Sequence, residues 1–392
     1  MKFQHLCFGI PKEIMPGEKR VAAIPDTVKK MVANGAKVLV EKGAGEGVYF
    51  DDSMYREAGA EIVDDVETLF RQADVVLKVK EPKFNAEKGK HEVDMMRRGQ
   101  YLIAFLHPAF PGNHEMVRKI SRNGITSFSL DFVPRISRAQ SMDALTSMST
   151  VAGYKGVLMA ANHLSRFLPM VGTAVGMIQP ARVLVIGTGV AGLQAAATAK
   201  RLGAVVYAAD IRPDASEQAA SVGAKIIDLA IPRDLAIGAG GYARKLPGEW
   251  LLRERETLAA HVAQSDIIIL TALIPGKLAP VIVTEDMVKS MKPGSVIVDI
   301  AIDQGGNCAL TEPGVTVDRH GVTIMGIQNI PGMVAMSSTW MFAHNVYNFL
   351  ENLIGDGKVR LDEEDEIIST CLLTRDGKIV HAGAREAMHL ED

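Results

Sequence analysis

The stretch "VLVIGTGVAGLQAAATAKRLGAVVYAADIRP", Val183 to Pro213, sets the fold of the second half of this chain. A short apolar run rich in β-branched residues leads directly into Gly187, Gly189 and Gly192. The segment after these glycines has helical spacing, and a second apolar run then ends at Asp210. A strand, a G-x-G-x-x-G turn, a helix and a second strand in this order predict a βαβ unit that binds a dinucleotide.

Each glycine of the motif has its own expected task. The first allows the tight turn, the second lets the backbone approach a pyrophosphate, and the third lets the helix pack on the strand. The free N–H groups at the start of the helix would then face the phosphates. We therefore assign cofactor binding to Gly187, Gly189, Val190, Ala191 and Gly192. The alternative is that the glycines make a structural turn and nothing more.

Asp210 ends the second strand about 20 residues beyond the motif, where such folds place an acid. Its carboxylate would accept hydrogen bonds from the adenosine ribose and repel a 2′-phosphate, so NAD(H) is the expected cofactor rather than NADP(H). Ile211 and Arg212 follow and are assigned to the same adenosine site. Arg212 complicates the choice, because an arginine can accommodate that phosphate.

Length and composition are those of an ordinary globular protein. The 392 residues correspond to two or three domains, and 47% hydrophobic with 23% charged residues is normal for a water-soluble chain. The net charge of −3 gives no basic field for nucleic acid. The cysteines, Cys7, Cys308 and Cys371, lack metal or disulfide spacing, so no metal is expected. With no signal peptide and no run of about 18 apolar residues, a cytoplasmic chain without a membrane span is expected.

Apolar runs alternate with helical patterns through both halves of the chain. In the first third, strands are expected within 36–43, 73–82, 100–108 and 125–132, and helices within 51–60 and 113–124. A long connecting helix is expected over 148–164, and further strands within 182–187, 204–210, 224–229, 265–273, 294–302 and 322–327. This alternation predicts an α/β protein with two Rossmann-like, doubly wound parallel-sheet domains and a cleft between them.

The end of the chain is expected to return to the first domain. A helix over 338–353 follows the second alternation, and strand-like runs flank Asp376-Gly377, which is a hairpin signal. The expected domains are therefore 1–145 together with 331–392, and 146–330, which carries the dinucleotide motif.

Several stretches of the chain resemble one family. The most specific is "PRISRAQSMDALTSMSTVAGYKG", 134–156, and it is accompanied by "AIGAGGYARKLPGEW", "TALIPGK", "VDIAIDQGGNC" and "TRDGKIVH". In these stretches, and over nearly its whole length, the chain resembles the NAD(H)-binding component of the proton-translocating NAD(P) transhydrogenases. That component is their domain I, carried on subunit alpha or on the first piece of a divided subunit alpha, and it is similar in turn to alanine dehydrogenase.

The resemblance implies a nicotinamide site in the loop 134–146. Residues that match this loop contact or organise the ring, namely Arg135, Ile136, Ser137, Gln140, Asp143 and Thr146. Among them Arg135, Gln140, Asp143 and Thr146 form the implied catalytic set, and Thr146 stands where the family usually has serine. The alternative is a capped loop entering the connecting helix, since aspartate and threonine are ordinary residues at a helix N-terminus.

The resemblance also implies a mobile lid over 236–250, in which glycines allow opening and closing at low steric cost. Gly241 would contact the nucleotide, and Tyr242 joins the catalytic set by covering the nucleotide and excluding water. The alternative is a surface linker. Leu273, in "TALIPGK", is implied to lie near the adenine or its ribose.

A further group, Arg20, Lys80, His107 and Asp303, resembles the substrate site of alanine dehydrogenase. In that enzyme the matching arginine and lysine hold the substrate, the histidine is the general acid/base, and the aspartate lies beside the reacting centre. Transhydrogenation needs no local proton transfer, so we interpret the group as a vestigial substrate site. Residual alanine dehydrogenase activity is the alternative.

The implied function is hydride transfer between NAD(H) on this chain and NADP(H) held by a partner subunit, coupled to proton translocation. The implied partners are a second copy in a homodimer and the NADP-binding and membrane-spanning subunits, with no nucleic acid. These partners would hold the chain on the cytoplasmic face of the inner membrane. The alternatives are a soluble NAD-dependent alanine dehydrogenase and a non-catalytic NAD-sensing module.

Overall fold

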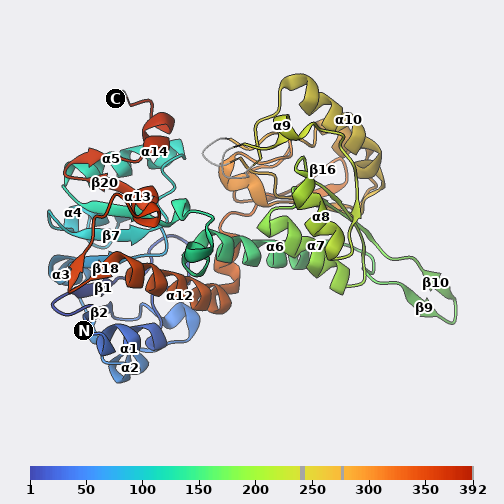
Figure 1. Ribbon diagram of the computed structural model, residues 1–392. Helices are drawn as coiled ribbons and strands as arrows, with labels where there is room; N and C mark the ends of the chain where they lie inside the picture. The colour runs from blue at the N-terminus through green and yellow to red at the C-terminus, as the bar shows by residue number, and fades with distance from the viewer. Residues whose placement is uncertain (239–242, 275–277, 391–392) are drawn as a thin grey trace. The chain divides into compact units, whose positions relative to one another are not determined.

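The computed structural model describes residues 1–238, 243–274 and 278–390, and it divides into two compact units (Figure 1). Unit 1 comprises Met1–Met148 and Gly332–Asp392, and unit 2 comprises Ser149–Pro331. The chain therefore builds most of unit 1, then all of unit 2, and then returns to complete unit 1.

The sheet of unit 1 has the strand order β21-β20-β8-β7-β4-β1-β2-β3. The strands from β8 to β3 run parallel to one another. Their bounds are β1 (Cys7–Ile10), β2 (Lys37–Glu41), β3 (Glu61–Val63), β4 (Val75–Leu77), β7 (Tyr101–Ala104), β8 (Thr126–Ser129), β20 (Leu372–Arg375) and β21 (Lys378–Ile379). Sequence analysis does not identify β1, whose four residues are too short a run to stand out.

Helices cover both faces of this sheet, as parallel pairing requires. Strand β4 shows the consequence, because Val75 and Leu77 enter one apolar core while Val76 enters the other. The helices are α1 (Pro25–Ala33), α2 (Asp52–Glu57), α3 (Val66–Gln72), α4 (Glu92–Met95), α5 (His114–Arg122), α12 (Ala335–Leu353), α13 (Glu366–Cys371) and α14 (Ala382–Ala387). Short 3-10 turns and hairpins complete the unit: η1 (Glu46–Val48), η2 (Pro111–Asn113), η3 (Leu130–Phe132), η4 (Ser137–Met142), β5 (Phe84–Asn85) with β6 (Lys90–His91), and β18 (Ile354–Gly355) with β19 (Lys358–Val359).

The C-terminal segment joins the sheet of unit 1, as predicted. Strand β20 pairs antiparallel with β8, and β21 pairs antiparallel with β20. Figure 1 shows β20 and α13, in red, beside the blue-green strands of the same unit. The turn between β20 and β21 has φ of 50° at Asp376 and 76° at Gly377. Positive φ at both positions is the geometry of a type I′ turn, which the Asp-Gly pair favours.

The sheet of unit 2 has the order β13-β12-β11-β14-β15-β17-β16. Only β16 departs from parallel pairing, since it runs antiparallel to β17, among the strands that the structure describes in this sheet. The bounds are β11 (Arg182–Ile186), β12 (Val205–Ala209), β13 (Lys225–Ile226), β14 (Ile267–Leu270), β15 (Val296–Asp299), β16 (Thr316–Arg319) and β17 (Val322–Met325). The strand expected over 224–229 is thus reduced to two residues at the sheet edge.

The helices of unit 2 lie on both faces of its sheet. They are α7 (Val190–Arg201), α8 (Pro213–Ser221), α9 (Arg233–Ala236), α10 (Gly248–Gln264) and α11 (Glu285–Ser290), with the 3-10 turns η6 (Ile300–Gln304) and η7 (Ile330–Val334). Helix α6 (Ala144–His163) connects the units and begins four residues before the expected helix. A two-stranded arm, β9 (Val171–Thr173) and β10 (Gly176–Ile178), extends away from the rest of unit 2 (Figure 1). Sequence analysis does not identify this arm.

Both sheets reverse their strand order at one point, between β1 and β4 in unit 1 and between β11 and β14 in unit 2. These are the topological switch points of doubly wound folds, outside which ligands bind at the carboxyl ends of the strands. The prediction of two Rossmann-like, doubly wound units is confirmed. Among the described residues, no helix combines the length and apolar character needed to cross a bilayer.

Candidate functional site

The glycine loop of unit 2 lies at the carboxyl end of β11, beside the switch point. Gly187 has φ of +85°, and a β-carbon there would lie 2.8 Å from the backbone nitrogen of Ala272. A β-carbon on Gly192 would lie 1.8 Å from the carbonyl oxygen of Gly187. The tight turn and the close contact of helix with strand therefore both depend on having no side chain at these two positions.

Gly189 differs from its two neighbours in the motif, because the space beside it is open. The nearest atom to a β-carbon built there is Nη2 of Arg212, at 3.8 Å. Gly189 is also the N-cap of α7, and no side chain caps this helix. Val190 and Ala191 form its first turn and are half-buried. Open space against free helix N–H groups fits the diphosphate of a dinucleotide.

Asp210 follows β12 and lies almost fully buried beside this loop. One oxygen, Oδ2, accepts the backbone N–H of Thr188 at 2.7 Å. The side chain of Arg212 donates to both oxygens, from Nε to Oδ1 at 3.0 Å and from Nη2 to Oδ2 at 2.9 Å. Ile211, between them, packs partly buried against the apolar core. The acid thus stands where a ribose would be read, with Thr188 holding it there.

The turn after β14 closes the same side of the sheet. Thr271 donates its hydroxyl to the carbonyl of Gly187 at 2.6 Å. The side chain of Asn307 both accepts from the backbone N–H of Ala272 and donates to its carbonyl, each at 2.9 Å. This two-bond contact fixes the backbone that precedes Leu273, whose side chain is left exposed. Sequence analysis did not select Thr271 or Asn307, since both act through backbone contacts.

Glu254 is a buried acid near Asp210 that sequence analysis missed. Burial, and next the charge of Asp210, raise the pKa of Glu254 to about 7, while Arg255 lowers it. Glu254 lies on α10 in line with the buried residues Leu258 and Val262. A glutamate within the apolar stripe of an amphipathic helix was the available signal.

Part of the expected lid, including Gly241 and Tyr242, lies outside the described residues. Its described ends are close together, since Ile237 and Ala243 form an antiparallel bridge. The backbone N–H of Arg244 also donates to the carbonyl of Ala236 at 2.9 Å. The residues on either side of 239–242 are therefore held together by backbone pairing, and the role of 236–250 as a lid stays a prediction.

The expected nicotinamide loop lies in unit 1, where Asp143 caps the start of α6. Its carboxylate accepts the backbone N–H of Thr146 at 2.8 Å and the Thr146 hydroxyl at 2.6 Å. This cap starts the helix at Ala144, earlier than expected. The capped loop expected as the alternative for Asp143 and Thr146 is thus present, and their role at a nicotinamide stays a prediction.

Hydrogen bonds from η4 and α12 hold the same loop against α12 and the start of α13. Arg138 donates two hydrogen bonds to the carboxylate of Asp365, at 2.9 and 3.1 Å. Asn345 and Asn348 donate to the carbonyl of Ser141, at 2.9 and 3.1 Å. Against this fixed base, η4 and the residues before it present exposed polar side chains, Arg135, Ser137 and Gln140, beside the half-buried Ile136. Arg138 was not selected from sequence, because its partner is more than 200 residues away.

His107 and Asp131 form a pair at the carboxyl ends of β7 and β8 in unit 1. The Nδ1 atom of His107 lies 2.6 Å from Oδ1 of Asp131. Burial lowers the pKa of His107, but the carboxylate of Asp131 more than offsets this effect, so the pKa is raised overall. The charge of Lys80 acts in the opposite direction to that of Asp131, which places this lysine nearby. Asp303, the fourth member of the expected substrate group, belongs to unit 2 and is exposed in η6.

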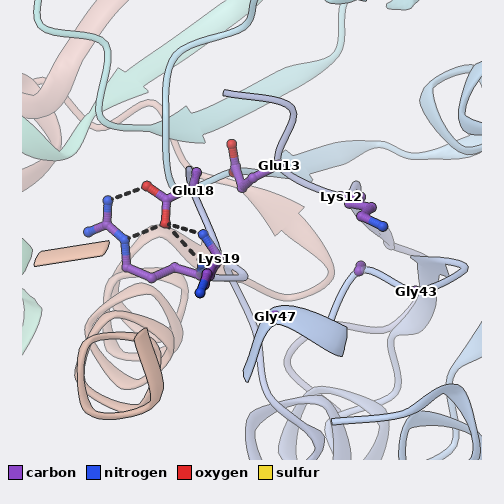
Figure 2. Close-up of a pocket in the computed structure, with 8 residues that line it drawn as sticks. Lys12, Glu13, Glu18, Lys19, Gly43 and Gly47 are labelled. Atoms are coloured by element: carbon purple, nitrogen blue, oxygen red, sulfur yellow. Dashed lines mark hydrogen bonds and ion pairs between the residues drawn. The ribbon is translucent and has the colours of Figure 1, made fainter. Parts of the chain in front are cut away.

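Arg20, the remaining member, is buried and paired with Glu18. Its Nε and Nη2 atoms donate to the two oxygens of Glu18 at 2.8 and 2.5 Å. Both line a cavity of about 60 Å³ together with Glu13 and Lys12 (Figure 2). Ligand pockets for cofactors are about 300–1,000 Å³, so this cavity by itself is too small for a nucleotide.

A buried ion triad fixes the switch point of unit 1. Lys78, at the end of β4, lies 3.2 Å from Oε2 of Glu13 and 2.9 Å from Oε1 of Glu92. The Glu13 carboxylate also accepts the backbone N–H of Val79 at 2.6 Å. Because all three side chains are at most 2% exposed, the triad joins three segments of unit 1 in a nearly solvent-free setting.

Comparison with known proteins identifies the family. The model "Alanine dehydrogenase/PNT, N-terminal domain" matches residues 9–152, and "Alanine dehydrogenase/PNT, C-terminal domain" matches 156–382. A Rhodospirillum rubrum protein named as the first piece of NAD(P) transhydrogenase subunit alpha is 47% identical over 378 residues, covering 95% of this chain and 97% of that protein.

Two further relatives agree with this result. The crystal structure of transhydrogenase from Sinorhizobium meliloti matches with a TM-score of 0.83 at 41% identity, covering 95% of this chain and 100% of the other. The alanine dehydrogenase of Methanococcus maripaludis is 32% identical over 393 residues, covering 98% of this chain and 97% of that enzyme. The chain therefore belongs to the alanine dehydrogenase/PNT family, and it is more similar to these transhydrogenase proteins than to this alanine dehydrogenase.

Proposed function

We propose that the chain is the NAD(H)-binding subunit of a proton-translocating NAD(P) transhydrogenase, exchanging hydride between its own NAD(H) and NADP(H) on a partner subunit. The observation that carries the proposal is the glycine loop of unit 2. The space beside Gly189 is open, and a buried acid, Asp210, lies at the adjacent strand end. The relative that is 47% identical is named as a subunit of this enzyme.

Each group of residues has a task in this proposal. The loop from Gly187 to Gly192 holds the diphosphate, Asp210 reads the adenosine ribose, and Leu273 contacts the adenosine. When bound, NAD(H) supplies or receives the hydride. Arg135, Ile136, Ser137 and Gln140 contact the nicotinamide, on a loop that Asp143 and Thr146 hold by capping α6.

The work of this chain is positioning rather than proton transfer. A fixed loop that exposes Gln140 can orient a carboxamide, because a glutamine side chain both donates and accepts. Closure of the segment 236–250 would exclude water, with Gly241 and Tyr242 at the nucleotide. Proton movement falls to the membrane-spanning partner.

The proposed assembly contains a homodimer of this chain with NADP-binding and membrane-spanning subunits, on the cytoplasmic face of the inner membrane. Two observations support it. The name of the Rhodospirillum rubrum relative describes one piece of a divided subunit, and so of a larger enzyme. The β9–β10 arm exposes Val175 and Met177, which is unusual for apolar side chains that have no partner.

The deciding experiment follows the hydride itself. The purified chain is mixed with the NADP-binding subunit of a transhydrogenase, NADH deuterated at the transferred position, and NADP⁺. Deuterium in NADPH, found by mass spectrometry only when both proteins are present, is the expected result. NADH binding without any deuterium transfer would contradict the proposal.

Alanine dehydrogenase is the second candidate, and the His107–Asp131 pair with Lys80 nearby is the observation that favours it. The test is the absorbance of NADH in the presence of L-alanine and NAD⁺, and then of pyruvate, ammonium and NADH. Turnover by the chain alone would give His107 and Lys80 a working role. Its absence would leave Arg20, Lys80, His107 and Asp303 as a vestigial site.

A further inference from the structure

Arg212 lies across the place where the adenosine ribose is expected. Its guanidinium grips both oxygens of Asp210, and its backbone N–H donates to Oδ1 at 2.8 Å. The side chains of Arg212 and Asp210 are 15% and 4% exposed. The Nη2 atom also lies 3.8 Å from the β-carbon position of Gly189, so the same group borders the open space of the glycine loop.

The carboxylate of Asp210 is fully used in this arrangement. A carboxylate offers about four lone-pair positions. Oδ1 accepts from the backbone N–H and from Nε of Arg212, and Oδ2 accepts from Nη2 and from the backbone N–H of Thr188. Ribose hydroxyls can therefore reach Asp210 only when the guanidinium of Arg212 has left it.

A second acid lies close enough to compensate the charge of the guanidinium after it leaves Asp210. Asp214, in the first turn of α8, contributes to the raised pKa of Arg212, so it lies close enough for its charge to act. Its carboxylate is 62% exposed and pairs at 3.1 Å with Arg233 on the outer surface. A rotation of the Arg212 side chain toward Asp214 keeps its charge compensated and uncovers Asp210.

We propose that Arg212 is a displaceable competitor of the dinucleotide, whose pairing with Asp210 sets how strongly the site distinguishes NAD(H) from NADP(H). The inference rests on the proposed dinucleotide function of unit 2. While Arg212 is paired, it neutralises the acid, which weakens both the attraction of ribose hydroxyls and the repulsion of a 2′-phosphate. An unpaired Asp210 would discriminate more sharply, since like charges brought together are strongly unfavourable.

The test compares the wild-type chain with Arg212→Gln by titration calorimetry against NADH and NADPH. It is carried out at about pH 6, below the pKa of about 7 of Glu254, so that this acid stays largely protonated during the comparison. The dissociation constant for NADH is expected to fall by about threefold and that for NADPH to rise, so that their ratio changes by about tenfold. Arg201→Gln, at the exposed end of α7, makes the same change in net charge and should leave the ratio unaltered.

Arg212→Lys keeps the charge but cannot make the two-pronged contact, so it should shift the ratio in the same direction by a smaller factor. Thermal unfolding shows whether Arg212→Gln is folded. If it is not, Arg212→Lys provides the test in its place. Weaker binding of both nucleotides in Arg212→Gln would make Arg212 a direct nucleotide ligand and overturn the inference alone. Failure of the wild type and both variants to bind either nucleotide would overturn the proposed function and the inference together. A structure of the NADH complex in which the Arg212–Asp210 pair is intact would overturn the inference and leave the proposed function standing.

Discussion

The carboxylate of Asp131 holds His107 at two points: Oδ1 lies 2.6 Å from Nδ1 of the imidazole, and Oδ2 accepts the backbone N–H of the same residue at 2.9 Å. His107 has a φ of +43°, which is uncommon for a non-glycine residue. The ring also stacks on Phe105, with the two planes 7° apart. Asp131 therefore fixes both the backbone and the ring of this histidine.

His107→Asn should lower the stability of unit 1 in a pH-dependent way. The pKa of His107 is raised in the folded protein and that of Asp131 is lowered. The stabilisation is thus fully present between the ordinary carboxyl and histidine values, about 4 and 6.5, and it is lost as pH rises through the raised histidine pKa. Because the His107 side chain is 35% exposed, about 1 kcal/mol is expected. Denaturant unfolding of both proteins from about pH 5 upward through the raised histidine pKa measures this loss, and a difference that stays constant over that whole span would refute the pair. Asparagine is the chosen replacement because it tolerates the positive φ of this position.

Two glycine substitutions in the same loop should affect different properties, one the stability of unit 2 and the other the affinity for NADH. Gly192→Ala places a β-carbon 1.8 Å from a carbonyl oxygen. Overpacking a core typically costs about 1–3 kcal/mol, so unit 2 should lose at least that much stability or fail to fold. Gly189→Ala meets no atom closer than 3.8 Å and should melt within a few degrees of wild type. It should still weaken NADH binding, because the added methyl group faces the expected diphosphate. Thermal unfolding and NADH titration separate the two, and normal NADH affinity in a folded Gly189→Ala protein would count against the site.

Gln140→Ala should lower the rate of hydride exchange more than the affinity for NADH. Its side chain is exposed on a loop that Arg138 and Asp365 hold in place, so its removal should leave the fold unchanged. A loss of orientation appears in turnover, whereas a loss of plain binding appears equally in both quantities. The deuterium-transfer rate and the NADH dissociation constant are the two readouts. Gln72→Ala, an exposed glutamine at the end of α3, is the matched control.

Lys78→Met should destabilise unit 1 by about 3–5 kcal/mol, because it leaves two glutamates buried without a cation. Burial raises the pKa of Glu13 to about 7 even though Lys78 lowers it, so the carboxylate depends on this lysine for its charge. The double variant Lys78→Met with Glu13→Gln should recover part of the loss. Lys90→Met, which breaks an exposed pair with Glu67, should cost less than about 1 kcal/mol. Denaturant unfolding gives all three values, and equal losses for Lys78 and Lys90 would refute the role of the triad.

The β9–β10 arm should determine oligomeric state. Val175 is 98% exposed and Met177 is 63% exposed at its tip, and an isolated two-stranded hairpin has little stability of its own. Val175→Asp should therefore shift a homodimer toward monomer, by about tenfold or more in dissociation constant. Sedimentation velocity over a range of concentrations measures this shift. Val315→Asp, at an exposed position outside the arm, is the control, and equal behaviour of the two variants would remove the arm from the interface.

Local patterns made much of the fold predictable. The run from Val183 to Asp210 contains a complete strand, turn, helix and strand, and the structure gives a steric reason for the glycines at 187 and 192. Asp376-Gly377 likewise specifies its own turn through two positive φ values. In both cases the residues that decide the conformation are neighbours in sequence.

What sequence could not supply depends on partners far apart in the chain. The pairing of Arg138 with Asp365 and of His107 with Asp131 depends on which strands and helices meet. Nothing in the local sequence of an arginine or a histidine identifies its partner. Strand β1 and the β9–β10 arm escaped because runs of three or four residues carry too little periodicity. Asp143 lies between these two cases. Its capping chemistry is recognisable from sequence, but placing the start of α6 at Ala144 requires knowing that Asp143 caps the helix.

The pairing of β20 with β8 has a consequence for the order of events on the ribosome. Ser127 and Thr374 share a hydrogen bond of 2.7 Å across these strands, although all of unit 2 is synthesised between them. At about 5–20 residues per second, β8 emerges roughly ten seconds or more before the strand that covers it. During that interval β8 presents an unpaired sheet edge, of the kind that can pair with strands of other chains. The C-terminal segment is what pairs this edge and completes the sheet of unit 1.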